Sequence, residues 1–165
     1  MTTHYSCAQL TGQLIDWSEK SAFRLIEALE TFGENAVPVF CYAGMSGSAL
    51  ATALSMAYWK RSKDFGMVYV RKEGEKSHGS EVEHDLKALR RGSDTAPIVL
   101  VFVDDLVEYG ATRRRVTEKT RLTLKQHNLV PCDNLIQCLR YDVTVRLWNG
   151  DRISDLTGTY FPLDT

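Results

Sequence analysis

The chain has 165 residues, and its 20 Lys and Arg nearly balance its 21 Asp and Glu, for a formal net charge of −1 at pH 7. A nearly neutral protein has no overall field that draws it to nucleic acid or to a membrane surface, so we expect neither as a partner. Hydrophobic residues make up 44% of the chain and aromatic residues 10%. This composition favours one folded domain over disorder.

Targeting segments and cysteine–histidine metal sites are not expected. No apolar run approaches the ~20 residues that span a bilayer. The first residues lack the basic-then-apolar pattern of a signal peptide, so we expect a cytoplasmic protein. The four cysteines and four histidines are scattered without the paired spacings of a zinc site.

The first half of the chain predicts a helix, a strand and a second helix. Residues 1–15 have little pattern and are expected to form a partial cap. Apolar residues recur at helical spacing over Asp16–Phe32, with Trp17, Phe23, Ile26 and Leu29 as the inward stripe. Residues 37–42 form an apolar run that predicts a core strand. A Gly/Ser-rich loop over 43–50 should then lead into a helix that ends near residue 59.

The middle of the chain predicts a strand over 65–70, followed by the polar segment 71–79. With no apolar anchor, this segment should be mobile when no ligand is bound. Val82, Leu86 and Leu89 at helical spacing predict a helix over 81–91, and residues 92–97 predict a turn.

The central segment begins with six apolar residues, 98–103, which predict a strand buried on both faces in a parallel sheet. Asp104 and Asp105 end this strand, and a short loop with Gly110 and Thr112 leads into a helix that ends near residue 128. In that helix, residues 116, 122 and 124 should point partly inward. This order predicts acids and free amides together at the carboxyl end of a strand, where α/β sheets bind ligands.

Three arginines, at 113–115, occupy the first turn of the predicted helix, where cations oppose the helix dipole. They either reach a phosphate or a neighbouring subunit, or they are exposed; we expect exposure for two of them. Further along, residues 134–140 and 143–148 predict strands. The pair Asn149-Gly150 is typical of a two-residue hairpin, so residues 151–153 should return antiparallel.

The central loop has a physical use for a sugar phosphate. Small residues at 110 and 111 let the backbone approach a phosphate, and the N–H groups at the helix start would point at it. Thr112 adds a hydroxyl. Asp104 and Asp105 would repel a phosphate, but they suit ribose hydroxyls or a Mg²⁺ ion shared with them. The alternative is an ordinary strand–helix turn.

This segment resembles the phosphoribosyl-pyrophosphate (PRPP) motif of type I phosphoribosyltransferases: a hydrophobic strand, two acids and a Thr-Gly-Gly-Thr-like loop. It departs from the family at Tyr109, usually Thr, and at Ala111, usually the second Gly. Two further motifs occur in the family order. Residues 44–49 resemble its pyrophosphate loop, and Ala43, just before them, stands where orotate-specific members have Lys. Residues 71–79 resemble the catalytic loop of orotate phosphoribosyltransferases, with Glu75 as one extra residue.

The resemblance covers about residues 37–140 and implies an α/β fold with a mostly parallel twisted sheet flanked by helices. It implies one domain over 1–165, with a core over about 16–140, a small hood from 1–15 and 141–165, and a C-terminal hairpin. The implied reaction is transfer of ribose 5-phosphate from PRPP to a nucleobase, with Mg²⁺ as cofactor and release of pyrophosphate. Orotate phosphoribosyltransferases commonly complete their sites with a loop from a dimer partner, so we expect a homodimer.

The resemblance also implies roles for individual residues. Asp104 and Asp105 would hold the ribose and, directly or indirectly, Mg²⁺, and Lys76 or His78 would act as an acid toward pyrophosphate. The 5′-phosphate would lie on Glu108, Tyr109, Gly110, Ala111 and Thr112, and the pyrophosphate on Ala43, Gly44, Met45, Arg71 and Lys72.

Several readings stay open. The glycines at 44 and 47 also suit any tight strand–helix turn, and the charged segment 71–79 also suits an exposed surface loop. Trp148, Tyr160 and Phe161 either stack on the base or close the core. The catalytic loop favours an orotate-like pyrimidine, with a purine possible. The alternatives to an enzyme are a non-catalytic PRPP- or nucleotide-binding regulator of the same fold and, less favoured, a flavodoxin-like phosphoacceptor domain.

Overall fold

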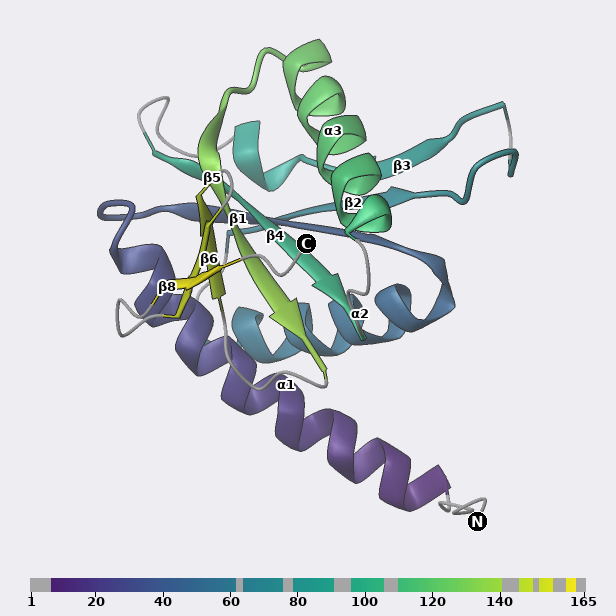
Figure 1. Cartoon of the computed structure of the whole chain (residues 1–165), viewed down its shortest axis with the longest axis vertical. Helices are drawn as coiled ribbons and strands as arrows, with labels where there is room; N and C mark the ends of the chain where they lie inside the picture. Colours follow the sequence, from purple (N-terminus) through teal and green to yellow (C-terminus); the bar gives the residue numbers. More distant parts are fainter. Residues whose placement is uncertain are drawn as a thin grey trace.

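One twisted sheet forms the centre of the molecule (Figure 1). The computed structural model describes residues 7–61, 64–75, 79–90, 96–105, 110–140, 146–149, 152–155 and 160–162. Within these residues the strands lie in the order β3-β2-β1-β4-β5-β6-β7-β8. The strands are β1 Val37–Ala43, β2 Gly66–Val70, β3 Val82–Asp85, β4 Ile98–Asp104, β5 Pro131–Leu139, β6 Arg146–Asn149, β7 Arg152–Asp155 and β8 Tyr160–Pro162.

The core of the sheet is parallel, as the sequence predicts. Strands β2, β1, β4 and β5 all run in one direction, with Cys41 of β1 opposite Val68 of β2 on one side and Phe102 of β4 on the other. Strands β3, β6, β7 and β8 add antiparallel edges. The six apolar residues of β4 are buried on both faces, which is the pattern of a central parallel strand. The predicted α/β fold class is therefore confirmed.

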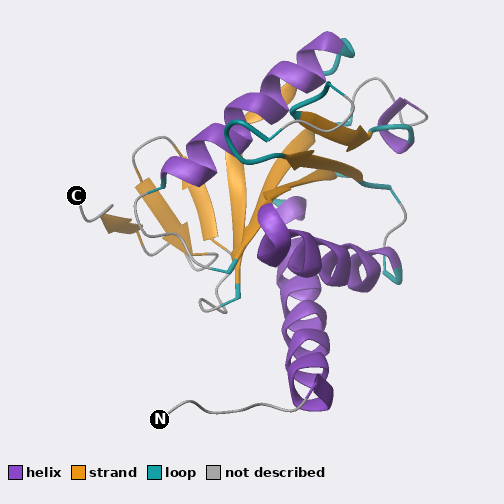
Figure 2. Cartoon of the chain, turned by 90° about the vertical axis from the view of Figure 1, so that its right-hand side faces the viewer, coloured by secondary structure: helices purple, strands orange, loops and turns teal. Residues whose placement is uncertain are grey.

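Helices cover both faces of the sheet (Figure 2). The helices are α1 Cys7–Glu30, α2 Gly44–Trp59 and α3 Ala111–Gln126, with a short 3₁₀ helix, η1, at Ala88–Arg90. Helices α1 and α2 pack on the face that carries Phe40, while α3 and η1 pack on the opposite face, which carries Cys41. Because successive strand residues point to opposite faces, the two helical layers have separate apolar cores.

An aromatic cluster ties α2 to the sheet. The Phe40 ring lies edge-on to those of Tyr58 and Phe65, with centroid separations of 5.8 and 5.6 Å. On the other face, Val116 and Leu124 of α3 are fully buried against Leu100 and Phe102. Edge-to-face ring pairs add to the stabilisation that burial of their apolar area gives.

Several predicted elements are confirmed within a few residues: the strands β1, β2, β4 and β5, helix α3, and the C-terminal hairpin, in which Asn149 pairs with Arg152. Two boundaries differ. Helix α1 begins at Cys7, so residues 7–15 are helical and not part of a loose cap. Helix α2 begins at Gly44, so the predicted Gly/Ser-rich loop forms the first turns of the helix.

The predicted helix over 81–91 is wrong. Val82–Asp85 is a strand, antiparallel to β2, and only η1 follows it. Hydrogen bonding to the open edge of β2 overrides the weak helical spacing. Leu86 and Leu89 are nevertheless buried, because both pack against Gly66 at the start of β2.

Two expected inward residues are exposed. Phe23 of α1 is 60% exposed and Leu122 of α3 is 58% exposed, whereas Trp17 and Leu124 on the same helices are buried. In each helix the buried face is narrower than the apolar spacing suggests. None of the described helices is both long enough and apolar enough to cross a bilayer.

Candidate functional site

The candidate site lies where the chain reverses its direction across the sheet. From β1 the chain moves to β2 on one side, and β4 is added on the other side, so β1 and β4 are neighbours at the point where strand order reverses. Ala43 ends β1 and Asp104 ends β4. In open α/β sheets ligands bind beside such a pair of carboxyl ends. The fold thus brings the predicted pyrophosphate and PRPP segments to one place.

Both helices that follow these strands begin at a glycine with left-handed backbone. Gly44, the first residue of α2, has φ +67°, and Gly110, the N-cap of α3, has φ +70°. The N-cap residues Ala43 and Gly110 have no polar side chain that could bind the first-turn N–H groups. These N–H groups carry the positive end of the helix dipole and suit an anion.

Glycine also permits close packing at this edge. A Cβ on Gly47, in the first turns of α2, would lie 3.3 Å from the Tyr42 Cβ and 3.4 Å from the Val103 carbonyl oxygen. The start of α2 therefore rests directly on the end of β4. A Cβ on Gly110 would lie 3.2 Å from a terminal nitrogen of Arg113, so glycine leaves room for that guanidinium beneath the start of α3.

The two acids adopt a mutually constrained arrangement. The Asp105 backbone N–H donates a hydrogen bond of 2.8 Å to Asp104 Oδ1. The pKa of Asp104 is raised to about 6, chiefly by burial; the backbone hydrogen bond from Asp105 opposes the rise, and the neighbouring Asp105 side chain adds to it. A cation or a set of hydroxyl donors at this position would favour the ionised form.

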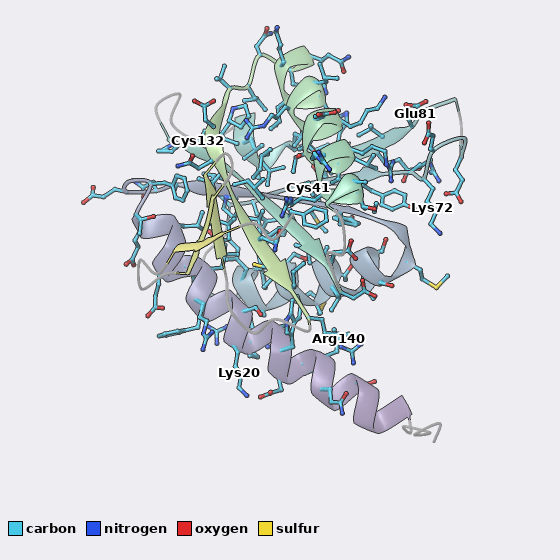
Figure 3. All side chains as sticks on the ribbon, viewed as in Figure 1. Lys20, Cys41, Lys72, Glu81, Cys132 and Arg140 are labelled. Atoms are coloured by element: carbon cyan, nitrogen blue, oxygen red, sulfur yellow. The ribbon has the colours of Figure 1, made fainter. Side chains whose placement is uncertain are left out.

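Cations from the β2–β3 hairpin lie next to the start of α2. Lys72 Cε lies 3.9 Å from the position that a Cβ on Gly44 would occupy. Arg71 is already engaged: its guanidinium forms an ion pair with Glu83 and lies over the Tyr69 ring, 5.6 Å from the centroid. Figure 3 labels Lys72 and Glu81 on this hairpin and Arg140 near the end of β5.

Of the predicted site residues, the fold brings Ala43, Gly44, Asp104, Asp105 and Gly110 to adjoining strand ends and helix starts. Met45, Ala111 and Thr112 are exposed in the first turns of α2 and α3. Arg71 and Lys72 follow β2. Four predicted residues lie outside the residues that the structure describes: Lys76, His78, Glu108 and Tyr109.

Three arginines near the site have contacts that sequence patterns do not predict. Arg113 is buried and donates a 2.8 Å hydrogen bond to Gln137 Oε1 on β5. Burial lowers its pKa, and the neighbouring Arg114 lowers it further. Arg115 donates to the Arg71 carbonyl oxygen. The Arg140 backbone N–H donates to the Asp104 carbonyl oxygen at 3.1 Å. In the sequence, the run of arginines at 113–115 pointed to Arg113 and Arg115, and no pattern pointed to Arg140.

The aromatic residues proposed for base stacking belong to the C-terminal strands. Trp148 lies in β6, and Tyr160 and Phe161 lie in β8. The structure describes the strand pairing of these residues and not their side chains.

Comparison with known proteins finds no matching family model and no matching curated protein. Among solved structures, the chain is similar to a hypoxanthine-guanine phosphoribosyltransferase from Bacillus anthracis (TM-score 0.45, 13% identity, covering 78% of this chain and 65% of that one). It is also similar to an orotate phosphoribosyltransferase from Francisella tularensis (TM-score 0.42, 17% identity, 76% and 50%). A third is a hypoxanthine phosphoribosyltransferase from Trypanosoma cruzi (TM-score 0.42, 14% identity, 68% and 58%).

The chain spans between half and two thirds of the length of these three structures. The structural neighbours named above are all phosphoribosyltransferases, at low sequence identity. The α/β fold class of this chain follows from its own sheet and helices.

Proposed function

We propose that the protein is a Mg²⁺-dependent phosphoribosyltransferase that transfers the ribose 5-phosphate of PRPP to a nucleobase and releases pyrophosphate. One observation carries the proposal. The reversal point between β1 and β4 combines two glycine-led helix starts with a pair of acids, and Lys72 lies across from Gly44. Such a place offers two anion-binding helix starts, with carboxylates between them that can accept hydrogen bonds from sugar hydroxyls.

Each part of the site would hold one part of PRPP. The α3 start at 110–112, with 108 and 109 before it, would bind the 5′-phosphate through backbone N–H groups and the Thr112 hydroxyl. Ala43, Gly44 and Met45 at the α2 start would bind pyrophosphate. Asp104 and Asp105 would accept hydrogen bonds from the ribose hydroxyls. Holding both ends of the substrate fixes the C1–oxygen bond in line with the base.

Lys72 would supply the cation that the Ala43 position lacks. Orotate-specific members of the resembled family have a Lys at that position, and here the nearest described counterpart comes from the hairpin, beside Gly44. Because Arg71 is paired with Glu83, Lys72 is the freer of the two charges for pyrophosphate. A cation fixed at the leaving group stabilises the charge that develops as the bond breaks.

The bond-breaking step would leave positive charge on the ribose ring and negative charge on pyrophosphate. We infer a dissociative, oxocarbenium-like transition state, with the carboxylates of Asp104 and Asp105 close to the ring hydroxyls. Lys76 or His78 would donate a proton to a pyrophosphate oxygen. Closure of the 71–79 segment would exclude water from the reacting centre.

The acid pair is a suitable but incomplete Mg²⁺ site. Carboxylate oxygens are the ligands that Mg²⁺ prefers, and a cation would relieve the repulsion between Asp104 and Asp105. In the part of the chain that the structure describes, no group of three or more acid, histidine or cysteine side chains is placed to hold a metal. Most of the ion's ligands would therefore come from PRPP and water, and when bound it would neutralise pyrophosphate charge.

The base is proposed from the catalytic-loop motif. The run Arg71-Lys72-Glu73 with Lys76, His78 and Gly79 favours an orotate-like pyrimidine, and a purine is possible. The test is a screen of orotate, uracil, adenine, hypoxanthine, guanine and xanthine with PRPP and Mg²⁺, in which pyrophosphate release is measured. We expect release with one base or with a closely related pair.

The acid pair gives the sharpest variant. Replacing Asp104 and Asp105 together by Asn should abolish turnover, a loss of at least about 10³-fold, because the negative charge of both carboxylates beside the ribose is lost. The circular dichroism spectrum should stay that of the wild type. Asp16→Asn, on the exposed face of α1, is the control and should keep wild-type activity. Wild-type turnover in the double variant would contradict the proposal.

A regulatory protein that binds PRPP or a nucleotide without chemistry is the second candidate. The residues at 43 and 109 favour it, because both replace side chains that the resembled enzymes carry. It predicts saturable PRPP binding, by calorimetry, with no pyrophosphate release for any base. Release with any base in the screen would exclude it.

A further inference from the structure

Two histidines that are far apart in the sequence meet on the surface, away from the site described above. His84 lies in β3 and His127 directly follows α3. Their Nε2 atoms are 3.2 Å apart, the ring centroids are 4.6 Å apart, and the rings meet edge to face at 69°. His84 is exposed and His127 is half-buried.

Regular structure fixes the approach of the two rings. His84 is held in register opposite Val68, because β3 pairs antiparallel with β2. The His127 backbone N–H donates to the Leu124 carbonyl oxygen and closes the end of α3. A second contact joins the same two segments, since Lys119 of α3 forms a 2.8 Å ion pair with Glu81. The two imidazoles therefore belong to elements that a second contact also joins.

The spacing of the two nitrogens is that of two ligands on one metal ion. At zinc–nitrogen bond lengths of about 2.0–2.1 Å and a tetrahedral angle, two imidazole nitrogens lie about 3.3–3.4 Å apart. Without a metal, the same contact requires one ring to donate an N–H to the other. A metal ion held by both nitrogens would take the place of that proton.

The surroundings leave room for the other ligands. A hollow of about 350 Å³ borders His84 and is lined by Gln126, Thr123 and Glu81, among others. In the described residues no third His, Cys, Asp or Glu completes a cluster with the pair. Water would therefore fill the remaining positions, and Gln126 lines the same hollow.

We propose that His84 and His127 form a surface binding site for a divalent transition-metal ion of the zinc, nickel or copper kind. Imidazole nitrogen suits these ions and not Mg²⁺, so the site is separate from the acid pair at the end of β4. A bound ion joins the end of α3 to β3 and so stabilises the folded chain. The inference does not depend on the proposed reaction.

The experiment uses the full chain after removal of metal with a chelator. Zn²⁺ and Ni²⁺ are titrated by calorimetry, with Mg²⁺ as the ion that should give no signal at this pair. We expect one equivalent of Zn²⁺ per chain and at least about tenfold weaker binding in both His84→Asn and His127→Asn. Because both rings hold one ion, loss of either ring should remove most of the affinity, and the double variant should bind no more tightly than either single one. His4→Asn is the control and should bind as the wild type does.

Two readouts keep the test decisive. Zn²⁺ should raise the melting temperature of the wild type and of His4→Asn and leave that of the two pair variants unchanged, while metal-free melting temperatures report their folding. In NMR spectra, the imidazole C–H signals of both residues should shift together with Zn²⁺. Equal Zn²⁺ affinity in wild type and pair variants, or no binding by the wild type at 1 mM Zn²⁺, would overturn the proposal.

Discussion

Gly110 shows how one residue sets the geometry of the candidate phosphate site. Its φ of +70° is costly for any residue with a Cβ, and Arg113 occupies the space beside it. The residue therefore serves two needs: it allows the turn into α3, and it leaves the buried guanidinium in place. The sequence predicts the first need from the loop pattern and gives no sign of the second.

Gly110→Ala should lower the free energy of unfolding by about 1–2 kcal/mol, from backbone strain and crowding of Arg113. It should also weaken PRPP binding, because the N–H groups at the α3 start move. Gly12→Ala is the matched control: Gly12 is helical, and a Cβ there meets nothing within 4 Å. That change should raise the free energy of unfolding by up to about 1 kcal/mol. Urea unfolding measures both. An equally stable Gly110→Ala would argue against the strain.

Asp104 should make stability depend on pH. Its pKa is about 6 in the folded chain, above the ordinary value of 3.8. Between these two pH values the folded state therefore keeps a proton on Asp104 that the unfolded state has lost. This contribution to stability is fully present below the unfolded value and disappears as pH rises through about 6.

In the Asp104→Asn variant, the free energy of unfolding should not show this decrease with rising pH. Curves for the wild type and the variant should converge near pH 4 and separate by about 1 kcal/mol at pH 7, after allowance for partial exposure, with the variant more stable. Urea unfolding from pH 4 to pH 8 measures the difference. Parallel curves across that range would mean that Asp104 is not desolvated.

At the scale of elements, the β2–β3 hairpin is the segment that sequence patterns describe least well. The sequence pattern predicts a helix for its second strand, yet that strand pairs with β2. The hairpin is joined to α3 by the contacts of Arg115 with Arg71 and of Lys119 with Glu81. These contacts connect the start of α3, where the 5′-phosphate would bind, with the hairpin that carries Lys72. Order at one segment should therefore influence the other.

Arg115→Met should loosen this connection. The amide of Arg71, which donates to the Glu81 carbonyl oxygen, should exchange its hydrogen about five- to tenfold faster, as expected for loss of one hydrogen bond worth about 1 kcal/mol. Arg114→Met, on the exposed side of the same turn, is the control. Hydrogen exchange followed by NMR measures the rates. Unchanged exchange at Arg71 would show that Arg115 does not hold the hairpin.

At the scale of the whole molecule, we propose a homodimer, as the resemblance to orotate phosphoribosyltransferases implies. Light scattering should give a mass near twice the 18.6 kDa of one chain. Full activity from a protein of single-chain mass at the assay concentration would contradict this. The outer face of α1 and α2 carries the exposed side chains Phe23, Met56 and Trp59, so interface variants can be chosen there.

The sequence by itself determined the parallel core and the order of the motifs. Buried strands are continuous apolar runs, glycines and acids follow them, and this local information survives folding because it depends on burial and backbone freedom. For the same reason α3 and the hairpin at Asn149 were predictable, whereas the strand character of 82–85 was not, since it comes from the open edge of β2.

Only the tertiary structure decided which charges lie near the site and which are already paired. Arg71 faces Glu83, Lys72 lies beside Gly44, Arg113 is buried against Gln137, and His84 meets His127. Each of these contacts joins residues that are between 12 and 43 positions apart in the sequence. Spacing along the chain contains no information about such pairs, because they form only when strands and helices have taken their places.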